Sequence, residues 1–161
     1  MKPIVRPRKP AAQRNRSGPY AGPPGTLLYR NSKYGFSIRL PRRWRCYTAV
    51  RRSTRWNAAE YSVCFLFKYK GKIYEPVLTL LVYRMTLKQW IAAGYDDSPI
   101  TRLAVRNGRI YGYAVPGELP EEFLNARGND YDYKRYGRPI RLLKRMVNCD
   151  VPRIIKTFRL R

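Results

Sequence analysis

Apolar and polar residues alternate near the start of the chain. The segment Tyr-Gly-Phe-Ser-Ile-Arg-Leu-Pro at positions 34–41 places an apolar side chain at every second position from 36 to 40. This pattern predicts a strand with one apolar face, ended by a proline that cannot donate a hydrogen bond to a neighbouring strand. Residues 26–30 are predicted to form a hairpin with it. Trp44 follows closely, and we expect its ring to fold back over the apolar face.

Similar patterns predict three further strands before residue 84. Residues 46–50 are predicted to form a strand, residues 60–69 alternate with period two, and the basic segment 51–55 between them is predicted to be a loop. Lys70-Gly71-Lys72 predicts a turn. Residues 77–83 form a nearly continuous apolar run, which is typical of a strand buried on both faces.

The period then changes to that of a helix. Thr86 is suited to cap a helix over residues 87–94, in which Leu87, Trp90 and Ile91 share one face and Gly94 ends the helix. Asn-Gly at positions 107–108 separates two alternating runs, 100–106 and 109–115. It predicts a two-residue hairpin turn, because both central residues of this turn adopt positive φ.

The last third of the chain is predicted to be a loop followed by helices. Residues 116–137 contain half of the ten acidic residues and one expected helical turn at 121–125. Two helices are predicted over 139–147 and 152–157, with apolar side chains facing the core: Ile140, Leu143, Val147, Ile154, Ile155 and Phe158. The element order β-β-β-β-β-α-β-β-α predicts an α+β fold, a central antiparallel sheet with helices packed on it.

Composition divides the chain into two parts. Residues 1–25 are rich in proline, glycine, arginine and lysine, and the first acidic residue of the whole chain is Glu60. We therefore expect a disordered basic tail at 1–25 and a single domain at 26–161. With 44% hydrophobic residues, the chain has enough apolar side chains to form a core.

The net charge of +24, from 34 Lys and Arg against 10 Asp and Glu, favours anionic partners. Arginine pairs with phosphate in bidentate geometry, and aromatic rings stack on unpaired bases. The densest basic and aromatic segment predicts an anion or partner-binding site at Arg39, Arg42, Arg43, Arg45, Arg51, Arg52, Arg55 and Trp56, with Trp44 and Tyr47 among them. The alternative is a solvated basic face with Trp44 in the core.

Several kinds of chemistry find little support in the sequence. Histidine is absent, which excludes Ser-His-Asp and Cys-His nucleophiles and histidine-bearing metal sites. Cys46, Cys64 and Cys149 lack zinc spacing, and we expect them to be buried small residues. Asp130-Tyr131-Asp132 lacks the spacing of a calcium loop, so a solvated acidic loop is favoured over a cation site. No catalytic residue, metal or cofactor is predicted, and a hydrolase using paired carboxylates is a distant alternative.

No signal peptide or membrane span is evident in the sequence. We expect a cytoplasmic protein as written, or an exported one if an upstream signal was removed. The basic tail lacks apolar anchors, so binding to a membrane surface would be weak and reversible.

The segment at 34–41 followed by Trp44 resembles the opening of the PsbP-like family, which commonly shows Tyr-Gly-Phe, apolar-x-apolar-Pro and x-x-Trp. The closing segment 151–159, with its Thr157-Phe158 pair, resembles the final helix of that family. The resemblance covers roughly residues 27–159. It implies an α/β/α sandwich around an antiparallel sheet and a non-catalytic docking role, and it carries over no functional residue. The chain differs from exported relatives in lacking an export signal and in being far more basic.

From these observations we predict a non-enzymatic binding or accessory protein. It would dock through its arginine-rich face and basic tail on an acidic macromolecular surface, either a protein or a membrane complex. The alternative is a nucleic-acid-binding protein that uses the same arginine and aromatic cluster. No small-molecule substrate is predicted.

Overall fold

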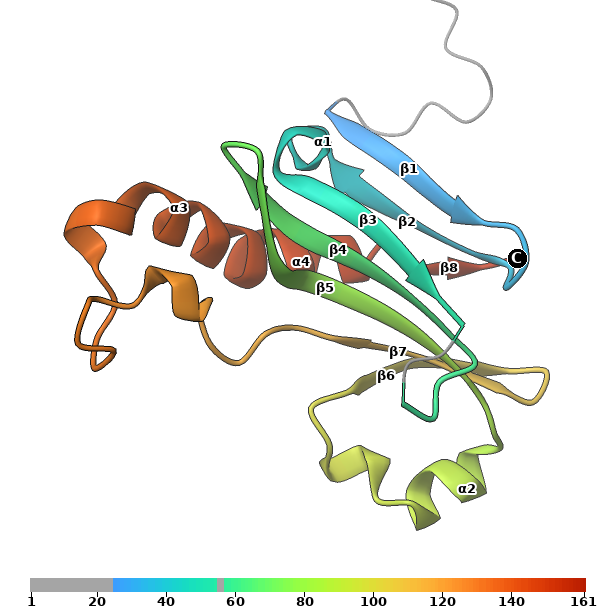
Figure 1. Ribbon diagram of the computed structural model, residues 1–161. Coiled ribbons are helices and arrows are strands. Elements are labelled where there is room, and N and C mark those ends of the chain that lie inside the picture. The colour runs from blue at the N-terminus through green and yellow to red at the C-terminus, as the bar shows by residue number, and fades with distance from the viewer. Residues whose placement is uncertain (1–24, 55–56) are drawn as a thin grey trace, which may run out of the picture.

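The computed structural model describes residues 25–54 and 57–161, and it confirms the α+β class (Figure 1). The strands form two antiparallel sheets, with helices packed on them. Residues 1–24, which make up nearly all of the predicted tail, lie outside the described residues, as do Arg55 and Trp56.

A three-stranded sheet is built around the alternating segment near the start of the domain. Its strand order is β1-β2-β8, and the strands are β1 (Thr26–Asn31), β2 (Phe36–Pro41) and β8 (Arg159–Leu160). Leu28 pairs with Arg39, which confirms the predicted hairpin. Phe36 pairs with Leu160 in β8, a two-residue strand that is too short to show any alternation in the sequence.

The larger sheet has five strands in the order β3-β4-β5-β7-β6. These are β3 (Thr48–Ser53), β4 (Tyr61–Tyr69), β5 (Lys72–Arg84), β6 (Thr101–Arg106) and β7 (Arg109–Ala114). Asn107 and Gly108 have φ values of 51° and 70°, so the predicted turn between β6 and β7 is confirmed. Lys70 and Gly71 make the corresponding turn between β4 and β5, with φ values of 47° and 77°.

The strand predicted at 46–50 begins later than expected. Residues Trp44–Tyr47 form a short helix, α1, and β3 then extends through Arg51 and Arg52, which were predicted to lie in a loop. The helical turn is closed by the Thr48 hydroxyl, which donates a hydrogen bond of 2.6 Å to the Trp44 carbonyl. This turn accompanies the burial of the Trp44 ring, which is only 1% exposed and lies over the apolar face as predicted.

Helix α2 (Leu87–Ala92) begins at the predicted cap. Thr86 and Gln89 form a reciprocal capping box, and Gly94, with a φ of 75°, follows the helix end and precedes the 3-10 turn η1 (Tyr95–Asp97). Leu87, Trp90 and Ile91 all lie in this helix as predicted, but Leu87 and Ile91 are 39% and 55% exposed. The helix has only six residues, and Trp90 alone is buried in it.

The C-terminal helices begin earlier and are more continuous than the two predicted segments. They are preceded by the 3-10 turn η2 (Glu121–Phe123) and comprise α3 (Tyr133–Arg145), the π-helical turn η3 (Met146–Asp150) and α4 (Val151–Ile155). Asp132 caps α3 by accepting a 2.9 Å hydrogen bond from the Arg135 backbone N–H. Tyr136 has non-helical angles of −114° and 15°, and this kink accommodates Pro139 inside the helix.

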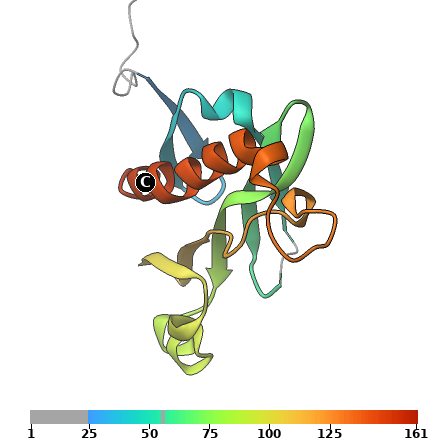
Figure 2. The same ribbon diagram turned by 90° about the vertical axis from the view of Figure 1, so that its left-hand side faces the viewer.

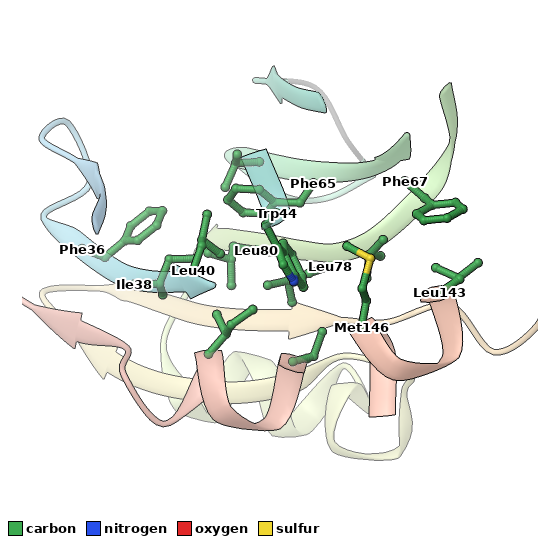
Figure 3. Packing of buried hydrophobic residues seen from close by; sticks show 14 of the residues in the cluster. Phe36, Ile38, Leu40, Trp44, Phe65, Phe67, Leu78, Leu80, Leu143 and Met146 are labelled. Atoms are coloured by element: carbon green, nitrogen blue, oxygen red, sulfur yellow. The ribbon is translucent and has the colours of Figure 1, made fainter. Parts of the chain in front are cut away.

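The main core lies between the two sheets and the C-terminal helices. Figure 3 shows Phe36, Ile38 and Leu40 from β2 facing Trp44, strand residues of β4 and β5, and Met146. A second cluster joins Trp90 of α2 to Leu81 and Tyr83 on the other face of β5. Helix α2 and η1 project from the five-stranded sheet away from α3 (Figure 2). No helix within residues 25–54 or 57–161 is long and apolar enough to cross a membrane.

Candidate functional site

The structure divides the predicted arginine cluster. Arg43 forms an ion pair and a hydrogen bond with the buried carboxylate of Asp150, so its positive charge is compensated within the protein. Arg39 is half-buried in β2, where its backbone N–H donates to the Thr157 hydroxyl at 2.8 Å. Arg42 and Arg45 are exposed on either side of Trp44.

Arg51 and Arg52 point to opposite faces, because they are consecutive residues of strand β3. Arg52 lies 3.3 Å from the Tyr29 hydroxyl through Nε. That contact raises the pKa of the Arg52 guanidinium above its ordinary value. Arg51 instead lines a hollow of about 480 Å³ beside Glu75 and Glu122. Arg55 and Trp56 lie outside the described residues. Among the described members of the predicted cluster, Arg43 is paired with Asp150, and Arg51 and Arg52 do not share one face of the sheet.

A different set of basic residues gathers around one groove. This groove, of about 550 Å³, lies between the β4–β5 turn and the first turns of α3. Its lining contains six basic side chains and four tyrosines, and no carboxylate among the described residues. The lining residues are Tyr69, Lys70, Lys72, Tyr74, Tyr133, Lys134, Arg135, Tyr136, Gly137, Arg138, Pro139 and Arg141. We call it the basic groove.

Helix periodicity explains how α3 presents its charges. Arg138 and Arg141 are three residues apart after the kink at Tyr136, so they lie on one face of the helix, and Lys134 lines the same groove from the turn before the kink. Gly137 leaves room between them: a Cβ atom added there would lie 3.1 Å from Nη1 of Arg141. Lys70, in the β4–β5 turn, supplies positive charge from the opposite wall. All three helix cations are exposed.

Three of the four groove tyrosines, Tyr69, Tyr74 and Tyr136, are anchored to the core by a series of ring contacts. Tyr69 stacks on Phe67 with 6.3 Å between ring centroids, and Phe67 lies 5.6 Å from Tyr74. Tyr74 is 5.0 Å from Phe123, which in turn is 5.2 Å from Tyr136. Phe67 and Phe123 are fully buried. The rings are therefore held in place by packing that does not depend on a ligand.

Each groove tyrosine also has a basic side chain over its ring. The cation lies 5.1–5.8 Å from the ring centroid in each pair, within the range of a cation–π interaction. The pairs are Lys70 with Tyr69, Lys72 with Tyr74, Arg135 with Tyr136, and Lys144 with Tyr133. Lys144 also donates a 3.1 Å hydrogen bond to the Tyr133 hydroxyl. Charges and rings are thus adjacent throughout the groove.

Two acidic side chains lie close to the basic groove without lining it. The Asp132 carboxylate caps α3. The pKa of Tyr74 is raised, first by burial and then by the negative charge of Glu122. A tyrosine phenol is already protonated at neutral pH, and the upward shift of the Tyr74 pKa favours the protonated, hydrogen-bond-donating form further.

The cysteine prediction is wrong for two of the three thiols. Cys46 and Cys149 are exposed and Cys64 is half-buried, and all three are free. Cys46 follows Trp44 on a short helix with one buried residue, which turns the thiol outward. The described residues contain no group of three or more carboxylate or cysteine side chains placed to hold a metal ion. Asp130 accepts a hydrogen bond from the Tyr131 backbone N–H at 2.7 Å.

The sequence prediction did not find the basic groove because its walls are about 60 residues apart and because residues 133–137 were assigned to a loop. The available signal was the spacing of Lys134, Arg138 and Arg141, which has helical period. Asp132 is a suitable N-cap for a helix at that position.

No family model, curated protein or solved structure matches the chain. The resemblance to the PsbP-like family therefore stays a prediction.

Proposed function

We propose that this chain is a non-enzymatic binding protein that docks on an anionic macromolecule through the basic groove. The observation that carries the proposal is the lining itself, which gathers six lysine and arginine side chains in one concavity without a carboxylate. Such an arrangement concentrates positive potential, raises the local concentration of anions and speeds their association.

The groove supplies what binding requires. Lysine and arginine provide ionic hydrogen-bond donors, and the tyrosine hydroxyls provide neutral ones. Its lining contains no carboxylate or thiol, so in a chain without histidine a catalytic mechanism there would have to use lysine or tyrosine. These features support a docking role over a catalytic one.

The exposed arginines predicted from the sequence extend the proposed surface. Arg42, Arg45 and Arg51 each add positive charge outside the groove. Their contribution is expected to be smaller, because single exposed charges interact weakly with a partner and are screened by salt. The order of elements in the α+β fold supports the further proposal that the architecture is PsbP-like.

Elution from a phosphocellulose column tests the groove as the docking site. We expect the triple variant Lys134→Ser, Arg138→Ser, Arg141→Ser to elute at clearly lower salt than the wild-type chain. All three positions are exposed on α3, so the fold should be retained.

A matched variant controls for net charge. Lys88→Ser, Arg102→Ser, Arg106→Ser removes the same number of exposed positive charges from α2 and β6, outside the groove. The proposal requires the groove variant to elute at lower salt than this control. Equal elution of the two variants would mean that phosphocellulose senses only total charge, and the proposed docking site would be wrong.

A further inference from the structure

We propose that the anion bound by the basic groove is a single-stranded nucleic acid, with its phosphates on the lysines and arginines and its bases stacked on the tyrosines. This inference rests on the proposed function and adds the chemical class of the partner. It is carried by the tyrosines, which a purely electrostatic docking site would not need.

The groove is rich in aromatic rings. Four of the twelve lining residues are tyrosines, and they come from both walls of the groove. Tyr133 is 48% exposed although it is a large aromatic residue. A base has an apolar face that stacks on such a ring, and this interaction tolerates any base sequence.

Two of the groove rings are held in place before a ligand binds. Tyr74 and Tyr136 both pack against the buried ring of Phe123, at 5.0 and 5.2 Å. A platform that is already ordered does not lose conformational entropy when a base stacks on it. The packing of these rings therefore favours stacking beyond what an exposed tyrosine on a mobile loop would provide.

Each tyrosine ring of the groove lies next to a lysine or arginine side chain. Lys70 lies 5.8 Å from the Tyr69 centroid, and Lys72 lies 5.1 Å from that of Tyr74. A nucleotide carries a base and a phosphate a few bonds apart, so it requires an aromatic surface and a positive charge side by side. When a base occupies the ring face, the flexible lysine stem allows its ammonium group to move onto the neighbouring phosphate.

A single strand would use both the rings and the cations of the groove, whereas the other anionic partners would not. A duplex keeps its bases stacked inside, which leaves the tyrosines without a partner, and an acidic protein or lipid headgroup satisfies the cations alone. The groove volume of about 550 Å³ also lies within the ~300–1,000 Å³ typical of sites for organic ligands, well above the size of a single phosphate group.

A comparison of three probes at about 150 mM salt tests the inference on the full chain. The probes are a 12-nucleotide oligothymidylate, an abasic deoxyribose-phosphate strand of the same length, and a 12-base-pair duplex. We expect the abasic strand to bind about tenfold more weakly than oligothymidylate, because it keeps the phosphates and loses the stacking. The duplex should also bind more weakly than oligothymidylate.

Single substitutions locate the stacking. Tyr133→Leu should weaken oligothymidylate binding about tenfold and leave the abasic strand unaffected, whereas Tyr133→Phe, which keeps the ring, should retain binding of both. The triple variant of Lys134, Arg138 and Arg141 should weaken both strands. For oligothymidylate binding by this variant, the slope of log affinity against log salt should be smaller in magnitude by about 2. Each lost phosphate contact accounts for about 0.7 of that change.

The outcomes distinguish the inference from the proposed function. If oligothymidylate and the abasic strand bind equally, and the triple variant still weakens both, the groove binds anions without stacking. The inference is then wrong, while the proposed function stands. If the triple variant binds all probes as the wild-type chain does, the groove is not the docking site and both proposals are wrong.

Discussion

The indole N–H of Trp44 donates a 2.8 Å hydrogen bond to Oδ2 of Asp150, a residue 106 positions later in the chain. The other carboxylate oxygen of Asp150 pairs with Arg43, and the residue is only 2% exposed. The π-helical turn Met146–Asp150 ends at this carboxylate. The buried carboxylate of Asp150 therefore holds the Trp44 ring in the core and positions the C-terminal helices against it.

We expect Asp150→Ala to lower the free energy of unfolding by about 2–3 kcal/mol. The substitution leaves the buried Trp44 N–H without an acceptor and the Arg43 guanidinium without its counter-ion. Urea denaturation followed by tryptophan fluorescence measures the change. Asp150→Asn keeps an acceptor for the indole and should therefore lower the free energy of unfolding by less. Glu118→Ala, at an exposed acidic residue, should have little effect on it. An equal loss for the alanine and asparagine variants would contradict the role assigned to the indole contact.

Glu60 should make folding stability depend on acidic pH. Its carboxylate accepts hydrogen bonds from Arg109 at 3.0 and 3.3 Å and from Arg84 at 3.0 Å. The Arg109 hydrogen bond is the main cause of a pKa below the ordinary value of 4.5. A lowered pKa means that the carboxylate stabilises the folded state above the pKa of the unfolded chain. That stabilisation is lost as the pH falls through the folded-state pKa.

The comparison with Glu60→Gln isolates this contribution. At neutral pH the variant should be less stable by up to about 1 kcal/mol, because the ion pairs are partly solvated. The difference should shrink as the pH falls below 4.5. Thermal denaturation of both proteins between pH 3 and 7, about the range in which a glutamate titrates, measures it. A difference that stays constant over this range would show that the carboxylate charge does not matter.

Tyr83 should lower stability at alkaline pH. Its ring packs against Trp90 at 5.5 Å, and burial raises the pKa of its phenol from 10.0 to about 12. The unfolded chain therefore loses this proton first, and stability falls as the pH rises from about 10 to about 12. Over that interval the free energy of unfolding of Tyr83→Phe should fall by about 1–2 kcal/mol less than that of the wild-type chain. At neutral pH it should be within about 1 kcal/mol of wild type. Parallel decline of the two proteins in alkaline urea titrations would contradict the prediction.

Gly112 should not tolerate a side chain. A Cβ atom at this position would lie 2.9 Å from Cγ2 of Ile100 and 3.1 Å from the backbone oxygen of Thr101. Because the oxygen belongs to the neighbouring chain segment, relief requires the backbone to move. We expect Gly112→Ala to cost about 1–3 kcal/mol in the free energy of unfolding by urea denaturation.

Gly137→Ala is the matched control for the Gly112 prediction. Its added Cβ would meet only the end of the Arg141 side chain, at 3.1 Å, and that side chain is able to rotate away. The cost should be below about 1 kcal/mol, since alanine also has the higher helix propensity. Similar losses for the two glycines would show that backbone contact at Gly112 is not the cause.

Features that depend on a few neighbouring residues were predicted from the sequence. The alternation around Phe36 gave β2, Asn107-Gly108 gave the hairpin of β6 and β7, and Thr86 gave the start of α2. In each case the backbone conformation follows from side chains within one turn or one strand. The burial of Trp44 was also predicted, because the apolar face of β2 is close to it in the chain.

The tertiary structure determined the features that depend on contacts between residues far apart in the chain. It placed α1 before β3, because the Trp44 ring meets Asp150 in the core, and it turned Arg51 and Arg52 to opposite faces of a strand. It also brought α3 to the β4–β5 turn. The sequence by itself determined the α+β class and a strongly basic surface. Where the charges converge was set by packing between segments about 60 residues apart, which no local pattern encodes.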